Sequence, residues 1–272
     1  MTPLVDIGAN LTNKAFRGDR DDVLRRAEAA GVGAIVITGV SAEASRAAWQ
    51  IASTPRDFGP RLYATAGIHP HHAGTSGASA IAELRELYTH PHVRAVGECG
   101  LDFDRDFSPR ADQRRVFEAQ LELAAELSLP VFLHERAAHE AFAEILGRHR
   151  PHIPKAVVHC FTGDERALDR YLELDLHIGI TGWICDERRG THLRKLVRRI
   201  PENRLMVETD APYILPRDLR PRPASHRNEP AYLPHVLRVI AACRGEPPAA
   251  LAEATTATAT AFFGIGPAAV PR

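Results

Sequence analysis

The sequence has few cysteines, very little lysine and no long run of apolar residues. Its four cysteines are far apart and form no C-x-x-C pair, so neither a disulfide framework nor a zinc ribbon is indicated. No apolar run approaches the roughly 20 residues that a membrane-spanning helix needs. The first residues lack the basic and apolar regions of a secretory signal. We therefore expect a cytoplasmic protein that does not contact a membrane.

An excess of charge of either sign is also missing. Thirty-four Lys and Arg balance 34 Asp and Glu, which argues against binding nucleic acid mainly through global positive charge. With 44% hydrophobic, 25% charged and 6% aromatic residues, the composition excludes collagen-like, coiled-coil and disordered classes. What the 272 residues do contain is 14 histidines, a generous number and the first sign of chemistry.

Short apolar runs alternate with amphipathic stretches along the whole chain. The runs lack a clean polar alternation, which is typical of parallel strands buried on both faces. The predicted strands are Leu4–Ile7, Ala34–Thr38, Leu62–Gly67, Val93–Gly97, Pro130–His134, Ala156–His159, His177–Ile180 and Leu205–Glu208. Between them, apolar residues recur at the helical period and often stop before Gly or Pro. Eight such alternations predict an α/β fold, a (β/α)8 TIM barrel.

An open doubly wound sheet is the alternative, but no G-x-G-x-x-G follows the first strand. No linker or repeat divides the chain, so we expect one domain over residues 1–272. The longer irregular segments follow the third, fourth, seventh and eighth strands: Pro70–Ser79, Leu101–Asp112, Thr181–Gly190 and Ala211–His235. In a barrel these loops gather at the carboxyl end of the strands, where active sites lie.

Polar side chains lie at or just past the ends of most predicted strands. The candidates are Asp6, Asn10, His69, Glu98, Asp102, His134, His159, Glu208 and Asp210. If the barrel is right, they project into one mouth, and imidazoles with carboxylates are a ligand set for a catalytic divalent metal. Each residue alone is more simply a capping or core residue. Their joint placement favours a metal-dependent hydrolase and leaves the substrate open.

Arginines and aromatic residues occur in the same loops. Arg188, Arg189 and the cluster from Arg194 to Arg199 follow the seventh strand, and Arg217, Arg220, Arg222 and Arg227 lie in the last long loop. Positive charge near the mouth would suit a phosphate-bearing substrate, although Arg194–Arg199 read more simply as a solvated helix face. The aromatic residues Phe103, Phe107, Trp183 and Tyr213 could stack on bases or only hold their loops in place.

Several motifs in order resemble the TatD family of metal-dependent deoxyribonucleases, in the amidohydrolase-like barrel superfamily. The matching segments are Gly67-Ile68-His69-Pro70, Gly97-Glu98-Cys99-Gly100-Leu101-Asp102, His159-Cys160-Phe161-Thr162-Gly163 and Glu208-Thr209-Asp210-Ala211-Pro212. Residues 6–12, 182–190 and 227–230 resemble the bacterial TatD branch more closely than its paralogues. The resemblance implies a metal-dependent 3′–5′ exonuclease acting on single-stranded DNA and RNA, and we expect a monomer.

The resemblance also implies roles for individual residues. Glu98, His134 and His159 match the divalent-metal ligands, and Asp210 matches the aspartate that serves as ligand or general base. We therefore expect Glu98 and Asp210 to be catalytic. The substrate-facing positions are Asn10, His69 and Arg136. One or two ions are implied, with Mg²⁺ expected and Mn²⁺ or Zn²⁺ as alternatives.

Two positions depart from the family pattern. Many members carry H-x-H after the first strand, where this chain has Gly8 and Asn10, which weakens one metal position. An Asp often follows the Arg after the fifth strand, where this chain has Ala137; His139 or Glu140 could compensate. Two other functions stay open: an amidohydrolase or esterase acting on a small molecule or on aminoacyl-tRNA, and a catalytically degenerate metal-binding protein.

Overall fold

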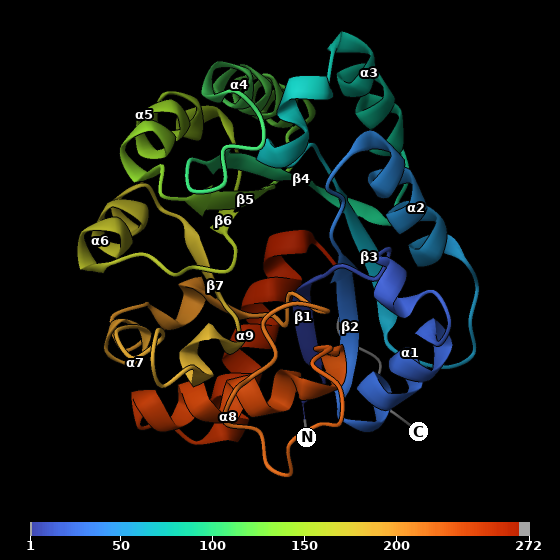
Figure 1. Ribbon diagram of the computed structural model, residues 1–272, viewed down its shortest axis with the longest axis vertical. Coiled ribbons are helices and arrows are strands. Elements are labelled where there is room, and N and C mark those ends of the chain that lie inside the picture. Colours follow the sequence, from blue (N-terminus) through green and yellow to red (C-terminus); the bar gives the residue numbers. More distant parts are fainter. Residues whose placement is uncertain (1, 267–272) are drawn as a thin grey trace.

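Eight parallel strands form one sheet in sequence order in the computed structural model, which describes residues 2–266 (Figure 1). The sheet curls into a nearly closed barrel, so the predicted (β/α)8 fold is confirmed. The strands are β1 (Leu4–Ala9), β2 (Val32–Ile37), β3 (Arg61–Ala66), β4 (Val93–Asp102), β5 (Val131–Arg136), β6 (Ala156–Val158), β7 (His177–Ile180) and β8 (Leu205–Val207).

Helices surround the barrel in the order of the chain (Figure 1). The α-helices are α1 (Arg20–Ala29), α2 (Ala42–Ser53), α3 (Ala78–Leu87), α4 (Arg110–Leu127), α5 (His139–His149), α6 (Glu165–Glu173), α7 (Leu193–Leu196), α8 (Leu233–Arg244) and α9 (Pro248–Phe263). The 3₁₀ helices are η1 (Lys14–Phe16), η2 (Pro70–Thr75), η3 (Arg150–His152), η4 (Gly182–Cys185), η5 (Glu202–Arg204) and η6 (Pro230–Tyr232). Within residues 2–266, none of these helices has the length and apolar character to cross a membrane.

The fourth strand is longer than the sequence predicts. Its predicted end is Gly97, but β4 continues to Asp102 and pairs with β5 from Cys99–Leu133 to Asp102–Arg136. Glycine allows the close approach of the two strands: a Cβ on Gly100 would lie 1.8 Å from the carbonyl oxygen of His134. Glu98 therefore lies inside a strand rather than in a loop, at the register shift between Val96 and Cys99, and its amide donates to the carbonyl of Gly39 at 2.7 Å.

The junction between β1 and β8 relies on the residues that follow β8. Ala9 and Ala211 form a single parallel bridge, and the amide of Asp210 donates to the carbonyl of Gly8 at 2.8 Å. The buried carboxylate of Asp6 accepts from the amide and the hydroxyl of Thr209, at 2.9 and 2.5 Å. This contact across the seam holds the segment before Asp210 against β1.

Helix α9 lies across the amino ends of the strands. Its Phe262 and Phe263 pack with interior barrel residues, among them Val5, Phe132 and Met206. Polar contacts tie the same helix to segments next to the strands: Arg94 in β4 donates to the carbonyl of Phe263 at 2.9 Å. The amino end of the barrel is thus closed by the last helix, and the opposite end carries the cavity described next.

Candidate active site

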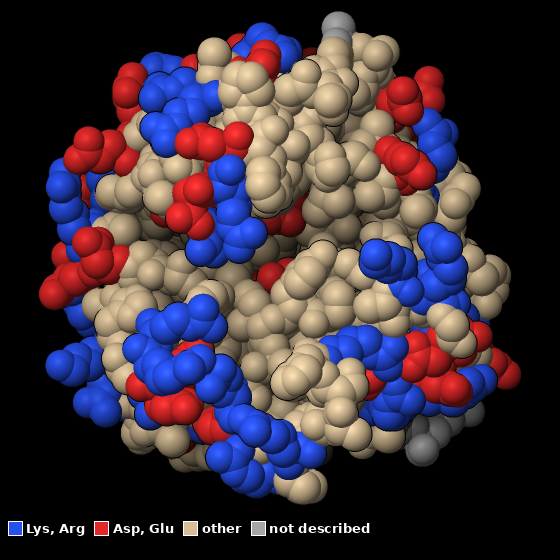
Figure 2. All heavy atoms as spheres, in the orientation of Figure 1, with Lys and Arg blue, Asp and Glu red and all other residues tan. Residues whose placement is uncertain are grey.

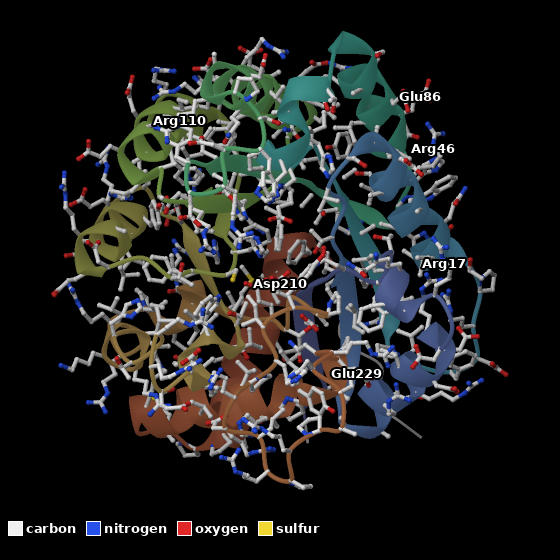
Figure 3. All side chains as sticks on the ribbon, in the orientation of Figure 1. Arg17, Arg46, Glu86, Arg110, Asp210 and Glu229 are labelled. Atoms are coloured by element: carbon white, nitrogen blue, oxygen red, sulfur yellow. The ribbon has the colours of Figure 1, made fainter. Side chains whose placement is uncertain are left out.

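A cavity of about 640 Å³ opens at the carboxyl ends of the strands. The seven residues to which the resemblance assigns a role in the site all line it: Asn10, His69, Glu98, His134, Arg136, His159 and Asp210. They come from six strands or the segments just after them. Figure 2 shows acidic atoms at the bottom of this hollow, and Figure 3 places Asp210 near the centre of the view. The structure therefore brings the predicted residues together.

Three imidazole nitrogens surround one carboxylate oxygen in the cavity. Oε1 of Glu98 lies 2.7 Å from Nε2 of His159, 2.9 Å from Nδ1 of His134 and 3.4 Å from Nε2 of His69. Glu98 is only 5% exposed, so these contacts are shielded from water. The sequence predicts His69 to face substrate, but its ring also belongs to this donor cluster.

The electrostatics of the cluster follow from burial and from these short contacts. Burial would raise the pKa of Glu98, but the His159 and His69 rings outweigh it and hold that pKa well below its usual range. Burial also opposes protonation of His159, yet Glu98 and Glu208 raise its pKa well above normal. The pKa of His69 is lowered, mainly by burial. Glu98 and His159 therefore favour their charged forms, whereas His69 favours its neutral form.

These residues fit a divalent metal. The donor atoms of His69, Glu98 and His134 all lie within 4.8 Å of one another. Nε2 of His134 is buried and has no hydrogen-bond partner, which is costly unless an ion, a water molecule or substrate contacts it. Imidazole nitrogens with carboxylate oxygens suit Zn²⁺, Mn²⁺ and, through the carboxylates, Mg²⁺. Both observations favour a metal site centred on Glu98.

Glu208 supports His159 from the side away from Glu98. Its Oε2 lies 3.3 Å from Nδ1 of His159, and its Oε1 accepts from the amide of Cys160. Such a carboxylate orients a histidine so that the other nitrogen is free for a metal. The sequence includes Glu208 among the strand-end candidates, but it does not predict the contact with His159.

The same carboxylate accounts for the glycine at position 8. A Cβ on Gly8 would lie 2.5 Å from Oε2 of Glu208 and 3.0 Å from the ring of Phe132. There is no room for a side chain at this position while Glu208 holds its present place. The loss of a histidine here is thus matched by a fully buried carboxylate in the same space.

Asp210 stands apart from the histidine cluster and has its own partner. The side-chain amide of Asn10 donates to its Oδ1 at 2.9 Å, so Asn10 orients this carboxylate. Burial raises the pKa of Asp210 to about 7, against the opposing charge of His159. A carboxyl group whose pKa lies near neutrality can both take up and release a proton.

A second pair beside the cluster has no counterpart among the sequence predictions. His71 Nε2 lies 2.6 Å from Oδ2 of Asp102, and the same oxygen is 3.8 Å from Nε2 of His134. Burial would raise the pKa of Asp102, but the nearby His134 ring and the hydrogen bonds from the Arg105 amide and His71 lower it. Asp102 belongs to a family motif, but His71 could not be identified because its contact depends on how η2 folds over β4.

The structure gives the contacts of three further residues that the sequence mentions near the site. His139 contacts the Tyr171 hydroxyl at 3.1 Å and Glu140 pairs with Arg166 at 3.2 Å, so neither stands in for an aspartate at position 137. Arg136 lines the cavity but is paired with Asp104 at 2.8 Å.

The two cysteines next to candidate ligands differ. Cys99 is fully buried, whereas Cys160 is only partly buried and lines the cavity. Burial raises the pKa of its thiol well above normal, so it is not set up as a nucleophile.

Comparison with known proteins decides the family. The pattern of the family described as TatD related DNase matches residues 5–264. The chain belongs to the TatD family. A TatD relative from Erwinia amylovora, named 3′-5′ ssDNA/RNA exonuclease TatD, is 52% identical over 262 residues, which cover 96% of this chain and all of the relative.

Solved structures show the same TatD barrel. YjjV, a TatD homologue from Escherichia coli K12, has a TM-score of 0.87 and 29% identity, and the match covers 97% of this chain and 98% of YjjV. An amidohydrolase from Saccharomyces cerevisiae has a TM-score of 0.84 and 26% identity over 97% of this chain and all of its own. The resemblance to the TatD family in the amidohydrolase-like superfamily is therefore confirmed.

Proposed function

We propose that this TatD family member is a metal-dependent exonuclease that removes nucleotides from the 3′ end of single-stranded DNA and RNA. The observation that carries the proposal is the convergence of His69, His134 and His159 on Glu98 in an open cavity, with Asp210 nearby. The printed name of the 52% identical relative supports the substrate and the polarity.

Glu98, His134, His159 and Asp210 would hold the metal, and His69 offers a further donor. The proposed ion is Mg²⁺, with Mn²⁺ as its closest substitute and one or two ions per site. When bound, it would polarise a phosphoryl oxygen and make a water molecule more acidic. Three neutral imidazoles would also tolerate Zn²⁺, so a test of the activity has to compare metals.

The remaining residues position the reaction. Asn10 holds the carboxylate of Asp210 in one orientation, and the pKa of about 7 allows that carboxylate to accept a proton from the attacking water. Glu208 keeps the ring of His159 turned toward Glu98. Proton transfer and positioning thus come from different side chains of one cavity.

Exposed aromatic rings at the rim fit a nucleic-acid end. Tyr213, which is 52% exposed, lines the cavity, and Phe107, which is 65% exposed, packs edge-on against His71 with 4.7 Å between ring centroids. Large apolar side chains left in water beside a polar cavity are suited to stacking on bases. Phe103 instead lies under Arg110, so it does not share this role.

The test is a time course on single-stranded DNA labelled at its 5′ end. It is run with Mg²⁺, with Mn²⁺ and with EDTA, beside the Glu98→Ala variant and a Glu140→Ala surface control. We expect a ladder that shortens one nucleotide at a time and is absent in EDTA and in Glu98→Ala. An intact substrate with every metal would contradict the proposal.

The two alternative functions, an amidohydrolase or esterase and a catalytically degenerate metal-binding protein, would each give a different result with the same protein samples. Hydrolysis of p-nitrophenyl esters or cyclic amides without nuclease activity would indicate an amidohydrolase. A measured metal content near zero after dialysis against each ion would indicate a degenerate site. Near-wild-type nuclease activity of Glu98→Ala would refute the assignment of the site rather than the reaction.

We also propose the coarser properties that the sequence predicts: one TatD-like domain over residues 1–272, a monomer and a cytoplasmic location. The uninterrupted family match over residues 5–264 supports the single domain. All four cysteines are free thiols, which fits a reducing compartment.

A further inference from the structure

A second cavity lies directly beside the active-site cavity. It has a volume of about 390 Å³, within the roughly 300–1,000 Å³ of typical ligand sites. It is formed by η4, the segment after it and the long loop that follows β8. Trp183 and Ile214 line both cavities, so these two residues are the wall between them.

The second cavity is basic. Three arginines, Arg189, Arg217 and Arg222, line it against one carboxylate, that of Asp186. Asp186 is 2% exposed and accepts from the amides of Arg188 and Arg189, which fixes it below the arginines. Figure 2 shows Lys and Arg atoms gathered beside the central hollow in this part of the molecule.

Two of these guanidinium groups have unused hydrogen-bonding capacity. Nε of Arg217 is buried without a hydrogen bond and lies 3.8 Å from Asp186. Arg222 is exposed and forms no ion pair with any residue that the structure describes. Arginine forks of this kind bind phosphate oxygens through paired N–H groups. Although that Nε is buried, the side chain of Arg217 is 35% exposed, so the rest of its guanidinium is open to an anionic ligand, as is that of Arg222.

Trp183 adds a flat surface to the wall. The guanidinium of Arg189 stacks on its ring at 4.4 Å from the centroid, which holds the indole in place. A fixed, partly exposed aromatic ring next to basic side chains is the combination that binds single-stranded nucleic acid without reading its sequence.

We propose that this second cavity binds the nucleic acid strand upstream of the nucleotide being removed. Arg217 and Arg222 contact backbone phosphates, and a base stacks near Trp183 as the strand crosses from one cavity to the other. This inference rests on the proposed exonuclease function, since it names where the rest of the same substrate lies. Binding of the strand in the second cavity gives the enzyme a preference for a longer nucleic acid strand over a dinucleotide.

The test measures binding separately from cleavage. Fluorescence anisotropy in EDTA compares a 5′-labelled dinucleotide with a dodecanucleotide, for the wild type and for Arg217→Ala/Arg222→Ala. Arg46→Ala/Arg85→Ala removes the same charge from α2 and α3 and is the matched control. Because Arg217 contacts Asp186, the exposed single variant Arg222→Glu guards against a folding defect.

We expect the Arg217/Arg222 variant to bind the dodecanucleotide at least about tenfold more weakly and the dinucleotide unchanged. The slope of log affinity against log salt should fall by about 0.7 for each phosphate that the variant no longer neutralises. Arg222→Glu should change affinity in the same direction. The proposal would be overturned if the Arg217/Arg222 variant lost the same factor of affinity for the dinucleotide as for the dodecanucleotide. It would also be overturned if the affinity of this variant for the dodecanucleotide stayed within about twofold of that of the control variant.

Cleavage of the dinucleotide and of the dodecanucleotide, measured with metal present, distinguishes a failure of this proposal from a failure of the proposed function. If the wild type cleaves neither of these two substrates, the exonuclease assignment is wrong. If it cleaves both and the Arg217/Arg222 variant keeps the wild-type preference for the longer strand, the exonuclease assignment stands and the second cavity has no part in substrate binding.

Discussion

The oxygen Oε1 of Glu98 is the point on which three histidine rings converge, and the carboxylates beyond those rings lie at different distances. Glu208 lies 3.3 Å from the far nitrogen of His159, while Nε2 of His134 forms no hydrogen bond and has Asp102 at 3.8 Å. The two histidines therefore depend differently on their surroundings. His159 is held in one orientation from both sides, and His134 is held mainly by Glu98.

This difference predicts the effect of changing Glu208. Glu208→Gln keeps the size of the side chain but removes the charge that orients His159, so metal affinity should fall about 10–100-fold. Titration with Mn²⁺ followed by calorimetry measures the change, with the exposed Glu140→Gln as control. An unchanged affinity with a normal circular dichroism spectrum would show that His159 needs no such support.

Asp6 gives a prediction for stability against pH. Burial raises its pKa from 3.8 to about 7, despite the hydrogen bonds from Thr209. Because the folded state holds this proton more tightly than the unfolded chain, stability falls as pH rises from about 4 to about 7, by roughly 1.4 kcal/mol for each pH unit. Above that range the loss is complete.

Chemical denaturation at a series of pH values tests this contribution. Asp210 contributes a similar slope, so Asp6→Asn, which cannot ionise, should remove about half of the decrease attributed to the two groups. Asp21→Asn on the exposed face of α1 is the charge-matched control and should leave the slope unchanged. An identical slope in Asp6→Asn and the wild type would show that Asp6 is ionised throughout.

Among the elements, the ends of three helices share one backbone conformation but not one residue type. Ser128, with φ 53° and ψ 39°, is the residue that directly follows α4, whereas Gly245 and Gly264 follow α8 and α9 in the same left-handed region. Ser128 is exposed, and nothing lies within 4 Å of a Cβ added to Gly245. The two positions thus differ mainly in the presence of a side chain.

Exchanging the residue types should shift stability in opposite directions. Ser128→Gly should raise the free energy of unfolding by about 1 kcal/mol and Gly245→Ala should lower it by a similar amount, because the left-handed region disfavours a Cβ. Each change corresponds to about 2–4 °C in Tm for a chain of this size. Differential scanning calorimetry of both variants checks the pair, and a shift of the same sign in both would contradict it.

For the whole molecule, metal binding and folding should be coupled. A saturating ion that binds only the folded barrel adds about 2.7 kcal/mol at 100 times its Kd, or roughly 5–10 °C in Tm. The gain should grow as pH rises, because the raised pKa values of His134 and His159 mean that an incoming ion must displace protons. Thermal unfolding with Mn²⁺ and with EDTA measures both effects.

The Glu98→Ala variant is the control for that experiment. Its Tm should be the same in Mn²⁺ as in EDTA, because its site lacks the central carboxylate. A Tm gain as large as in the wild type would place the stabilising ion elsewhere in the molecule.

Much of this architecture could be predicted from sequence because it repeats. Buried parallel strands have short apolar runs, and all eight were found within a few residues of their observed bounds. The exception is β4, which was predicted to end at Gly97 but continues to Asp102, with Gly97 and Gly100 allowing β5 to pack closely against it. The residues of β4 alone do not show how near the neighbouring strand lies.

The sequence was enough to predict which residues gather in the site. It was not enough to predict which of their side chains contact one another. The barrel rule places the residues after each strand at one end, which was enough to collect Glu98, His134, His159 and Asp210. The occupation of the space beside Gly8 by Glu208, and the pairing of His71 with Asp102, depend on side-chain packing between distant segments. No spacing along the chain encodes such contacts.

Helix α9 also has a consequence for how the protein is made. It follows all eight strands in the chain, yet its Phe262 and Phe263 cover the apolar interior of the barrel. On the ribosome, the strands emerge before the residues that cover them, so the nascent barrel has an open apolar end until α9 is synthesised. Docking of α9, rather than completion of the sheet, is the step at which this barrel can first hide its interior from water and from chaperones.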